Sequence, residues 1–390
     1  MRDVFACVVW TARDALRDVG RLRFIARPRS TRCARFAECR RPCSMPHMRT
    51  ARSPLHLFVL VCIVALLSGC AAVGTVRQGD VAGKTFVVTG ASSGFGKGVA
   101  QQLGELHANV VLAARRTELL QEIASTIQRA GGQSLVVTTD VGKPEDMARL
   151  AQATLDRFGR IDVWINNAAV GAIGRFEDVP MADHSRLVDT NIKGVMYGSH
   201  LAMRQFRAQG HGSLVNIGSV ESEVPLAYHA SYSASKAAVL SLGRALNEEI
   251  RLSGARNIAV STVMPWATDT PFFTHTANYS GGTPRMAAFD DPQKVVDAIV
   301  WVSLHPREEF PVGWKAQAAV MSHWLAPDLT ERISADIAHH QQVETAPPAP
   351  PTSGSLHAPM AAGREVDGGV RERMKREDAE REQAKKKAQR

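Results

Sequence analysis

The chain has no cysteine beyond position 70. All six cysteines lie in the N-terminal part, at Cys7, Cys33, Cys39, Cys43, Cys62 and Cys70. The rest of the sequence therefore has no disulfide framework, no cysteine-based zinc site and no cysteine nucleophile. Cys33, Cys39 and Cys43 lie near His47, but their spacing fits no common zinc pattern and arginines crowd them. We expect no metal site.

Lysine is absent from the first 55 residues, although the net charge of the chain is +9. That segment has 13 arginines and four acidic residues, which accounts for the whole excess charge and leaves the rest balanced. Aromatic residues are few, at 6%, and the hydrophobic content is 45%, as is typical of a globular α/β protein. Because the positive charge is confined to one segment, we expect no nucleic-acid partner.

Charge and composition divide the 390 residues into four segments. Residues 1–55 are Arg-rich and aperiodic, and we expect them to be disordered or not translated. Residues 56–76 are a signal or membrane segment, and residues 80–340 are a single α/β domain. Residues 341–390 hold a Pro/Ala linker, Pro347–Pro351, and a charged tail that we expect to be a solvated, partly helical extension.

One long run without charge is present, Leu57–Val76. Twenty such residues can span a bilayer as a helix. The run also contains Leu67–Cys70, which resembles the lipobox of bacterial lipoproteins, with two arginines ahead of it and Met45 or Met48 as a natural start. A lipoprotein signal is favoured over an uncleaved anchor, and both are favoured over a buried core helix. We expect membrane association, with the side of the membrane left open.

Short apolar runs alternate with stretches of helical periodicity from residue 84 onward. The expected strands are Lys84–Thr89, Val110–Ala114, Leu135–Val141, Ile161–Ile165, Leu214–Ile217 and Ile258–Val263. A helix is expected from Gly94, and further helices separate the strands. Such alternation produces right-handed crossovers and a parallel sheet covered on both faces. We therefore predict an α/β fold, a Rossmann-type doubly wound parallel sheet in a single domain.

A glycine-rich turn, Thr89–Gly96, follows the first strand and opens the first helix. Glycines let the backbone approach a pyrophosphate, and the helix N-terminus offers unpaired N–H groups. The turn alone is weak evidence, but its position between strand and helix predicts a dinucleotide site. The expected cofactor contacts in this turn are Gly90, Ser92, Ser93, Gly94, Phe95 and Gly96.

No carboxylate follows the second strand, where a NAD-binding unit places Asp or Glu to accept the ribose 2′-OH. The sequence there is Ala114-Arg115-Arg116. Arg115 can pair bidentately with a 2′-phosphate, and Arg116 adds positive charge. The alternative is a pair of solvated surface arginines. The pattern favours NADP(H) as the cofactor.

Tyr232 and Lys236 are four residues apart, which on a helix places them on one face. The lysine ammonium is expected to lower the phenol pKa, so that Tyr232 exchanges a proton with a carbonyl or alcohol oxygen near neutral pH. Ser219, just beyond an expected strand, can hold the same oxygen. A Tyr/Lys pair alone usually lies on the surface without a function. These residues, however, are expected at the carboxyl ends of the strands, where ligands bind in a doubly wound sheet.

With these motifs in order, the chain resembles the short-chain dehydrogenase/reductase family over residues 82–270, with an extension to about 330. The turn Thr89–Gly96 matches the Thr-Gly-x-x-x-Gly-x-Gly motif of that family. The catalytic tetrad of the family is matched by Asn191, Ser219, Tyr232 and Lys236. Further matches around the cofactor are Asp140, Val141, Asn167, Ala168, Ala169, Pro265, Thr268 and Thr270.

The resemblance implies an oxidoreductase that reduces a carbonyl, or oxidises a secondary alcohol, by hydride transfer with NADP(H). Tyr232 is implied to be the acid/base and Ser219 to hold the oxygen. Lys236 is implied to lower the tyrosine pKa and to bind the nicotinamide ribose, while Asn191 positions a water. The resemblance also implies a homo-oligomer.

Three departures from the family pattern stand out. Ala169 and Trp266 replace usual glycines, the latter beside the nicotinamide, and the usual last strand is weak at Pro311–Trp314. The segment 266–289, the usual lid, is rich in aromatics. Such a lid indicates an apolar or ring-bearing substrate, and it is equally consistent with lid packing. The alternative function is a membrane-tethered NADP(H)-binding protein with a redox-sensing or scaffold role and no turnover, which the complete tetrad disfavours.

Overall fold

The computed structural model describes residues 73–388. The six cysteines, the lipobox-like sequence and most of the long uncharged run lie outside the described residues. Within 73–388, no helix has both the length and the apolarity needed to cross a bilayer. The same residues contain no cluster of three or more histidine, cysteine or acidic side chains suited to a metal ion.

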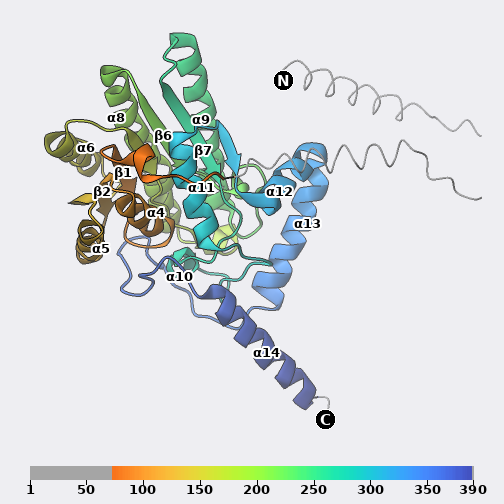
Figure 1. Ribbon diagram of the computed structural model, residues 1–390. Coiled ribbons are helices and arrows are strands. Elements are labelled where there is room, and N and C mark those ends of the chain that lie inside the picture. The colour runs from red at the N-terminus through yellow and green to blue at the C-terminus, as the bar shows by residue number, and fades with distance from the viewer. Residues whose placement is uncertain (1–72, 389–390) are drawn as a thin grey trace, which may run out of the picture. The chain divides into compact units, whose positions relative to one another are not determined.

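A seven-stranded parallel sheet forms the centre of the described domain (Figure 1). The strands are, in spatial order, β3 (Gln133–Thr138), β2 (Asn109–Ala114), β1 (Thr85–Thr89), β4 (Val163–Asn166), β6 (Gly212–Ile217), β7 (Ile258–Met264) and β9 (Glu309–Pro311). Every neighbouring pair is parallel. The order reverses direction between β1 and β4, as in a doubly wound fold, and ligands bind beside that point. The predicted fold class is confirmed.

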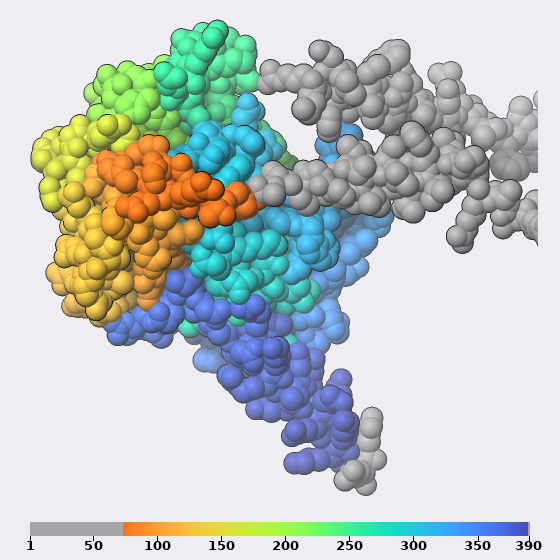
Figure 2. All heavy atoms as spheres, viewed as in Figure 1, coloured from red at the N-terminus to blue at the C-terminus, as the bar shows by residue number. Residues whose placement is uncertain are grey.

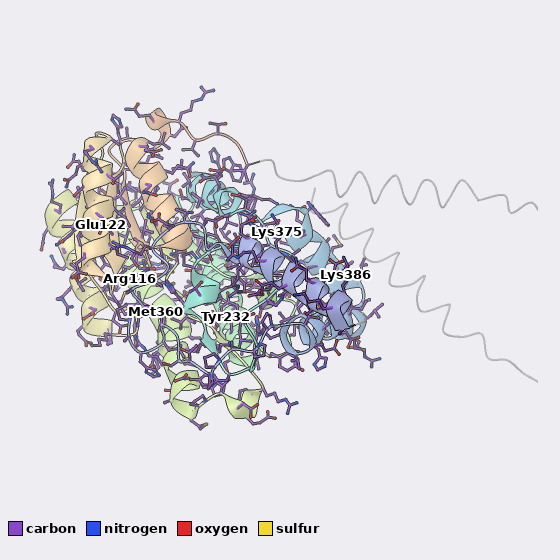
Figure 3. All side chains as sticks on the ribbon, turned by 90° about the horizontal axis from the view of Figure 1, so that it is seen from below. Arg116, Glu122, Tyr232, Met360, Lys375 and Lys386 are labelled. Atoms are coloured by element: carbon purple, nitrogen blue, oxygen red, sulfur yellow. The ribbon has the colours of Figure 1, made fainter. Side chains whose placement is uncertain are left out.

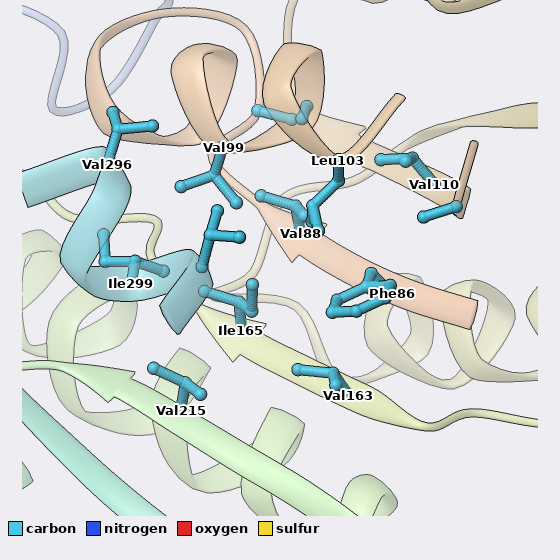
Figure 4. Packing of buried hydrophobic residues seen from close by; sticks show 14 of the residues in the cluster. Phe86, Val88, Val99, Leu103, Val110, Val163, Ile165, Val215, Val296 and Ile299 are labelled. Carbon is cyan, nitrogen blue, oxygen red and sulfur yellow. The ribbon is translucent and has the colours of Figure 1, made fainter. Parts of the chain in front are cut away.

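Helices cover both faces of the sheet, which is why its strands are apolar on both sides. One face packs against α4 (Gly94–Glu105), α5 (Thr117–Arg129) and α11 (Pro292–Leu304). The other packs against α6 (Pro144–Phe158), α8 (Gly194–Gln209) and α9 (Ala230–Ser253). Figure 4 shows the first core, in which Val99 and Leu103 of α4 and Val296 of α11 lie over Val88 and Ile165. Burying each such side chain contributes roughly 1.5–3 kcal/mol.

Shorter elements connect and extend this core. Those before β9 are α3 (Gln78–Val81), β5 (Ala172–Ile173), η1 (Phe176–Asp178), α7 (Met181–Val188), η2 (Asp189–Lys193), η3 (Val220–Ser222), α10 (Phe272–His275) and β8 (Ala277–Asn278). Those after it are α12 (Gly313–Leu325), α13 (Pro327–His339), η4 (His340–Glu344) and α14 (Val370–Ala388). β5 and β8 pair as a separate two-stranded parallel sheet.

Several expected strand boundaries were shifted by one to three residues, and two differences bear on the site. β3 ends at Thr138 rather than Val141, because its partner β2 ends at Ala114, which is opposite Thr138. Asp140 therefore lies on a loop. The last strand ends at Pro311, since the chain enters α12 at Gly313.

The expected solvated tail begins at Arg364, but the chain already contacts the domain from residue 352 to residue 369, a segment that we call the C-terminal strap. The strap crosses back over the domain, and its Leu356 is fully buried. In Figure 2 this dark blue segment lies against the orange and yellow surface of the N-terminal half of the domain. α14 fits the expectation better, since residues 382–388 are exposed. Small and proline residues made the strap look like a linker, and many of its contacts are made by backbone carbonyls, which composition does not reveal.

Candidate active site

The glycine-rich turn lies between β1 and α4 and is packed tightly against the loop after β4. Gly90 has a φ of +68°, and a Cβ there would stand 2.8 Å from the Ala168 Cα. A Cβ on Gly96 would stand 2.3 Å from the Gly90 carbonyl oxygen. The Asn167 side-chain amide donates to the Thr89 carbonyl at 2.8 Å and locks the two loops together. The turn thus brings bare backbone and a helix N-terminus to one surface, which suits a pyrophosphate.

A pocket of about 670 Å³ opens at the carboxyl ends of the strands. It brings together nearly all the residues that the sequence assigned to the cofactor. Those that line it are Gly90, Ser92, Ser93, Gly94, Phe95, Arg115, Arg116, Asp140, Val141, Asn167, Ala168, Ala169, Pro265, Thr268 and Thr270. Ser219, Tyr232 and Lys236 line the same pocket. Gly96 and Asn191 are buried and do not line it.

The three catalytic candidates come from two elements. Ser219 follows β6 and begins the short turn η3, where its Oγ accepts a hydrogen bond from the Glu221 N–H at 3.1 Å. Tyr232 and Lys236 lie one turn apart on α9. The Lys236 Nζ donates to the Ile217 carbonyl at 2.7 Å and lies 5.6 Å from the centroid of the Tyr232 ring. The helical spacing therefore does place both side chains at the pocket.

The expected lowering of the Tyr232 pKa by Lys236 is wrong for this structure. Burial raises the tyrosine pKa, the negative charge of Glu221 raises it further, and only a hydrogen bond with Ser219 lowers it. Burial also lowers the pKa of Lys236 to about 8, while Glu221 acts in the opposite direction. The lysine is thus close to losing its proton at mildly alkaline pH.

Asn191 lies in a π-helical turn, η2, between α7 and α8. Such turns interrupt helices at functional sites. Its side chain is fully buried, accepts from the Val170 N–H at 2.9 Å and donates to the Val170 carbonyl at 2.9 Å. It also donates to the Ser235 Oγ at 3.0 Å. Asn191 therefore fixes the loop after β4 to helix α9.

Sequence reasoning missed a buried polar cluster beside Ser219. The carboxylate of Glu221 accepts from the Ser233 Oγ at 2.7 Å and lies 3.1 Å from the His229 Nδ1. The His229 ring meets the Tyr232 ring edge to face at a centroid distance of 6.5 Å. Glu221 and His229 both line the pocket. Their position between Ser219 and Tyr232 in the sequence was the available signal.

The two arginines after β2 are not solvated surface residues. Arg115 donates to the carbonyls of Ser355 and Leu356, at 2.6 and 3.0 Å. Arg116 donates to the Ser93 Oγ at 2.7 Å and to the strap carbonyl of Met360 at 3.2 Å. Figure 3 shows Arg116 and Met360 next to each other at the edge of the domain. Their alternative reading as a free surface pair is therefore wrong.

Asp140 is held by an arginine that the sequence did not single out. The Arg186 guanidinium forms an ion pair with the Asp140 carboxylate at 2.6 Å, and both side chains are largely buried. Asp140 also accepts from the Gly142 N–H at 3.1 Å. The pair fixes the loop after β3 where the resemblance places the adenine.

The far side of the pocket is apolar. Trp266 lines it and donates from its indole N–H to the Ala288 carbonyl at 3.0 Å, which fixes the larger ring that replaces the usual glycine. The Tyr232 ring packs against Phe272 of the lid at a centroid distance of 5.3 Å. The remaining apolar walls come from η3, the loop after it, and helices α12 and α13: Val220, Val224, Leu226, Leu325, Leu329 and Ile333.

A doubly wound sheet with a glycine-rich turn and a serine, tyrosine and lysine at one pocket defines the class of nucleotide-dependent oxidoreductases. Residues 84–279 match the family described as short chain dehydrogenase. The chain belongs to this family.

Known proteins agree with that assignment. An uncharacterized oxidoreductase of Bacillus subtilis (strain 168), YxnA, is 33% identical over 277 residues, which are 70% of this chain and 78% of the relative. The crystal structure of a 3-ketoacyl-(acyl-carrier-protein) reductase from Brucella melitensis complexed with NADH has a TM-score of 0.52 and 26% identity, covering 59% of this chain and 96% of that one. A metagenomic short-chain oxidoreductase in complex with NADP has a TM-score of 0.50 and 28% identity, with shares of 59% and 96%. Structures of this kind bind either cofactor.

Proposed function

We propose that this protein is an NADP(H)-dependent oxidoreductase that interconverts a carbonyl and a secondary alcohol, with Tyr232 as the acid/base. The observation that carries the proposal is the shared pocket. Ser219, Tyr232 and Lys236 line the same cavity as the glycine-rich turn and the two arginines. A substrate bound in this cavity would therefore be close to both the cofactor and the proton donor.

The residues of the pocket fit a dinucleotide. The tight Gly90 turn and the N-terminus of α4 suit the pyrophosphate, and Arg115 and Arg116 suit a 2′-phosphate. The bound cofactor supplies or accepts the hydride. Lys236, which donates to the Ile217 carbonyl, would hold the nicotinamide ribose.

The proton chemistry belongs to the side chains of this chain. Ser219 holds the substrate oxygen through its Oγ, and Tyr232 donates its phenolic proton to that oxygen in the direction of reduction. The raised Tyr232 pKa keeps the phenol protonated before the reaction. In the opposite direction the same oxygen takes the proton back.

The substrate is proposed to be an apolar ketone or aldehyde, or the matching alcohol. Leu226, Leu329 and Ile333 support this, because they give the pocket an apolar wall opposite the catalytic side chains. Leu329 and Ile333 are also more than half exposed at the mouth of the pocket, where a bound substrate would cover them. Burial of apolar substrate surface there favours binding.

Replacement of Tyr232 by phenylalanine tests the chemistry. Tyr232→Phe removes only the hydroxyl, so turnover is expected to fall by about two to four orders of magnitude while NADPH affinity stays within about threefold. The measurement is NADPH oxidation with a panel of ketones and aldehydes, beside NADPH binding by fluorescence. Tyr197→Phe, on α8 outside the pocket, is the matched control. Turnover of Tyr232→Phe within a few-fold of the wild type would overturn the assignment and favour a binding protein without turnover.

Replacement of Arg115 tests the cofactor. Two charge-assisted hydrogen bonds to a 2′-phosphate favour NADPH by about tenfold to a hundredfold. Arg115→Asp should reverse the preference, because a carboxylate repels the phosphate and accepts the ribose hydroxyl. Arg116→Ala should weaken NADPH binding more mildly. Dissociation constants for NADPH and NADH decide the point, and no change in their ratio in Arg115→Asp would exclude the arginine as a phosphate contact.

A further inference from the structure

The C-terminal strap occupies the hydrogen-bonding groups that a 2′-phosphate would use. Both terminal nitrogens of Arg115 donate to strap carbonyls, those of Leu356 and Ser355. One terminal nitrogen of Arg116 donates to three more, of Met360, Ala362 and Gly363, at 3.1 to 3.3 Å.

These partners carry no negative charge, and only Arg115 is partly compensated, by the nearby Asp140 carboxylate. Within residues 73–388 neither guanidinium pairs with a carboxylate, and their partners are neutral oxygens. Burial lowers the pKa of Arg115, the negative charge of Asp140 opposes this, and the charge of Arg186 lowers the pKa further. Burial also lowers the pKa of Arg116, and the charges of Arg115 and Arg364 lower it further. Carbonyl dipoles satisfy the donors here, but an anion would satisfy the donors and the charge together.

The strap is also a wall of the cofactor pocket. Ser355, Pro359 and Met360 line the cavity together with the glycine-rich turn. Beyond the arginines, the Glu365 carbonyl accepts from the Gly94 N–H at 2.9 Å, and the Glu365 carboxylate pairs with Lys97 at 2.6 Å. The strap thus lies over the adenosine end of the site and is fastened to the helix that begins there.

Its two ends are held at different places. At the start, the Ser355 N–H donates to the His275 carbonyl at 2.8 Å. At the end, the Gly368 N–H donates to the Asp269 carbonyl at 3.1 Å, and the Asp269 carboxylate accepts from the Val370 N–H at 2.8 Å. Release of the middle segment from the arginines therefore does not require release of α14.

We propose that strap residues 355–363 are an intramolecular competitor of the 2′-phosphate, so that NADP(H) displaces them from Arg115 and Arg116. NAD(H) leaves these arginine contacts in place, and both cofactors meet the Glu365 carbonyl at the Gly94 N–H alike. The proposal rests on the 2′-phosphate site of the proposed function. Closure of the strap reduces the apparent affinity for NADP(H) by the fraction of molecules that are open. The strap thereby makes the ratio of NADP(H) affinity to NAD(H) affinity smaller than the two arginines alone would give.

Gly354 offers a substitution that weakens the strap without touching the arginines. Gly354 has a φ of +52°, and a Cβ there would stand 2.2 Å from the His275 carbonyl oxygen. Gly354→Ala should therefore push the strap away from the domain. Gly369→Ala is the matched control, because Gly369 has a φ of +67° but open space around its Cβ position. An alanine is strained by the positive φ at either position, but only the alanine at position 354 also clashes with the His275 carbonyl.

Binding of two nucleotides that differ only in the 2′-phosphate, adenosine 2′,5′-bisphosphate and 5′-AMP, is measured by calorimetry on full-length protein. If nine molecules in ten are closed, Gly354→Ala should bind the bisphosphate about tenfold more tightly than the wild type does. Its affinity for 5′-AMP should change by less than about threefold, and Gly369→Ala should match the wild type for both. Equal or weaker bisphosphate binding in Gly354→Ala overturns the competition.

Hydrogen–deuterium exchange on the wild type provides the second readout. Saturating bisphosphate should speed exchange in the strap peptides that contain Ser355 and Gly363, whereas saturating 5′-AMP should not. Slower or unchanged exchange with bound bisphosphate would mean that the strap clamps the nucleotide or ignores it, and it overturns the proposal. A bisphosphate that binds no better than 5′-AMP to any variant refutes the cofactor assignment as well, while the Tyr232→Phe assay still decides the chemistry independently.

Discussion

Glu221 affects the ionisation of Tyr232 and Lys236 second only to burial, although it belongs to none of the motifs that identify them. Its carboxylate is buried, is held by Ser233 and His229, and raises the pKa values of both Tyr232 and Lys236. For the tyrosine this adds to the effect of burial, and for the lysine it opposes burial. We propose that Glu221 is a positioning residue that helps to keep Lys236 charged.

The charge state of Lys236 predicts a pH dependence. Its pKa is lowered to about 8, so the ammonium is present below that pH and is lost as the pH rises through it. Reductase activity should fall over the same range if the charged lysine is required. Glu221→Gln removes the charge that raises this pKa, so the falling limb should move to lower pH by about one unit. The measurement is kcat/KM for NADPH-dependent reduction against pH.

Glu223→Gln is the matched control for that experiment. Glu223 lies two residues away and pairs with Arg244 at the surface of α9, without an effect on the lysine. Its pH profile should coincide with that of the wild type. If the fall in kcat/KM occurs at the wild-type pH in Glu221→Gln, then the Glu221 carboxylate does not raise the pKa of Lys236.

At the scale of elements, the ends of helices and strands bring the site together. β1, β4 and β6 end at one edge of the sheet, and α4 and α9 place the turn and the Tyr/Lys pair there. Helices α12 and α13 follow the last strand and supply the apolar mouth of the pocket. Several of their apolar side chains remain exposed, among them Leu325 at 67% and Leu329 at 59%.

Leu329 on α13 tests whether this mouth binds substrate. Leu329→Ser should raise KM for a long-chain or ring-bearing ketone by about three- to tenfold, because part of the apolar contact is lost, and should leave KM for a short ketone unchanged. Leu252→Ser is the matched control, since Leu252 is 74% exposed on α9 and lies away from the pocket. Parallel steady-state kinetics with both ketones separate the outcomes. Equal effects on the two substrates would assign Leu329 to lid packing instead.

At the scale of the whole molecule, the segment 56–76 is proposed to attach the domain to a membrane. The support is the uncharged run and its Leu67–Cys70 ending. If Cys70 is acylated, cells given a radioactive fatty acid should label the wild type and Cys62→Ser, and label should be lost in Cys70→Ser. Label retained in Cys70→Ser would reject the lipobox, and an unlabelled wild type would leave the uncleaved anchor as the form of attachment.

The sequence by itself determined the sheet, the turn and the candidate catalytic side chains. The sheet, the turn and the Tyr/Lys pair can be predicted from local patterns. Strand periodicity, glycine spacing and a four-residue helical step each depend on residues that are close together in the sequence. The positions of Ser219, Tyr232 and Lys236 at one pocket followed from the rule that parallel strands end at one edge.

Only the tertiary structure decided the electrostatics and the closure of the site. The pKa values of Tyr232 and Lys236 depend on burial and on Glu221, which no spacing rule evaluates. The strap meets Arg115 across about 240 residues of sequence, through backbone carbonyls that every residue possesses. A contact made by backbone groups over such a separation leaves no side-chain pattern, so it emerges only when the chain is folded.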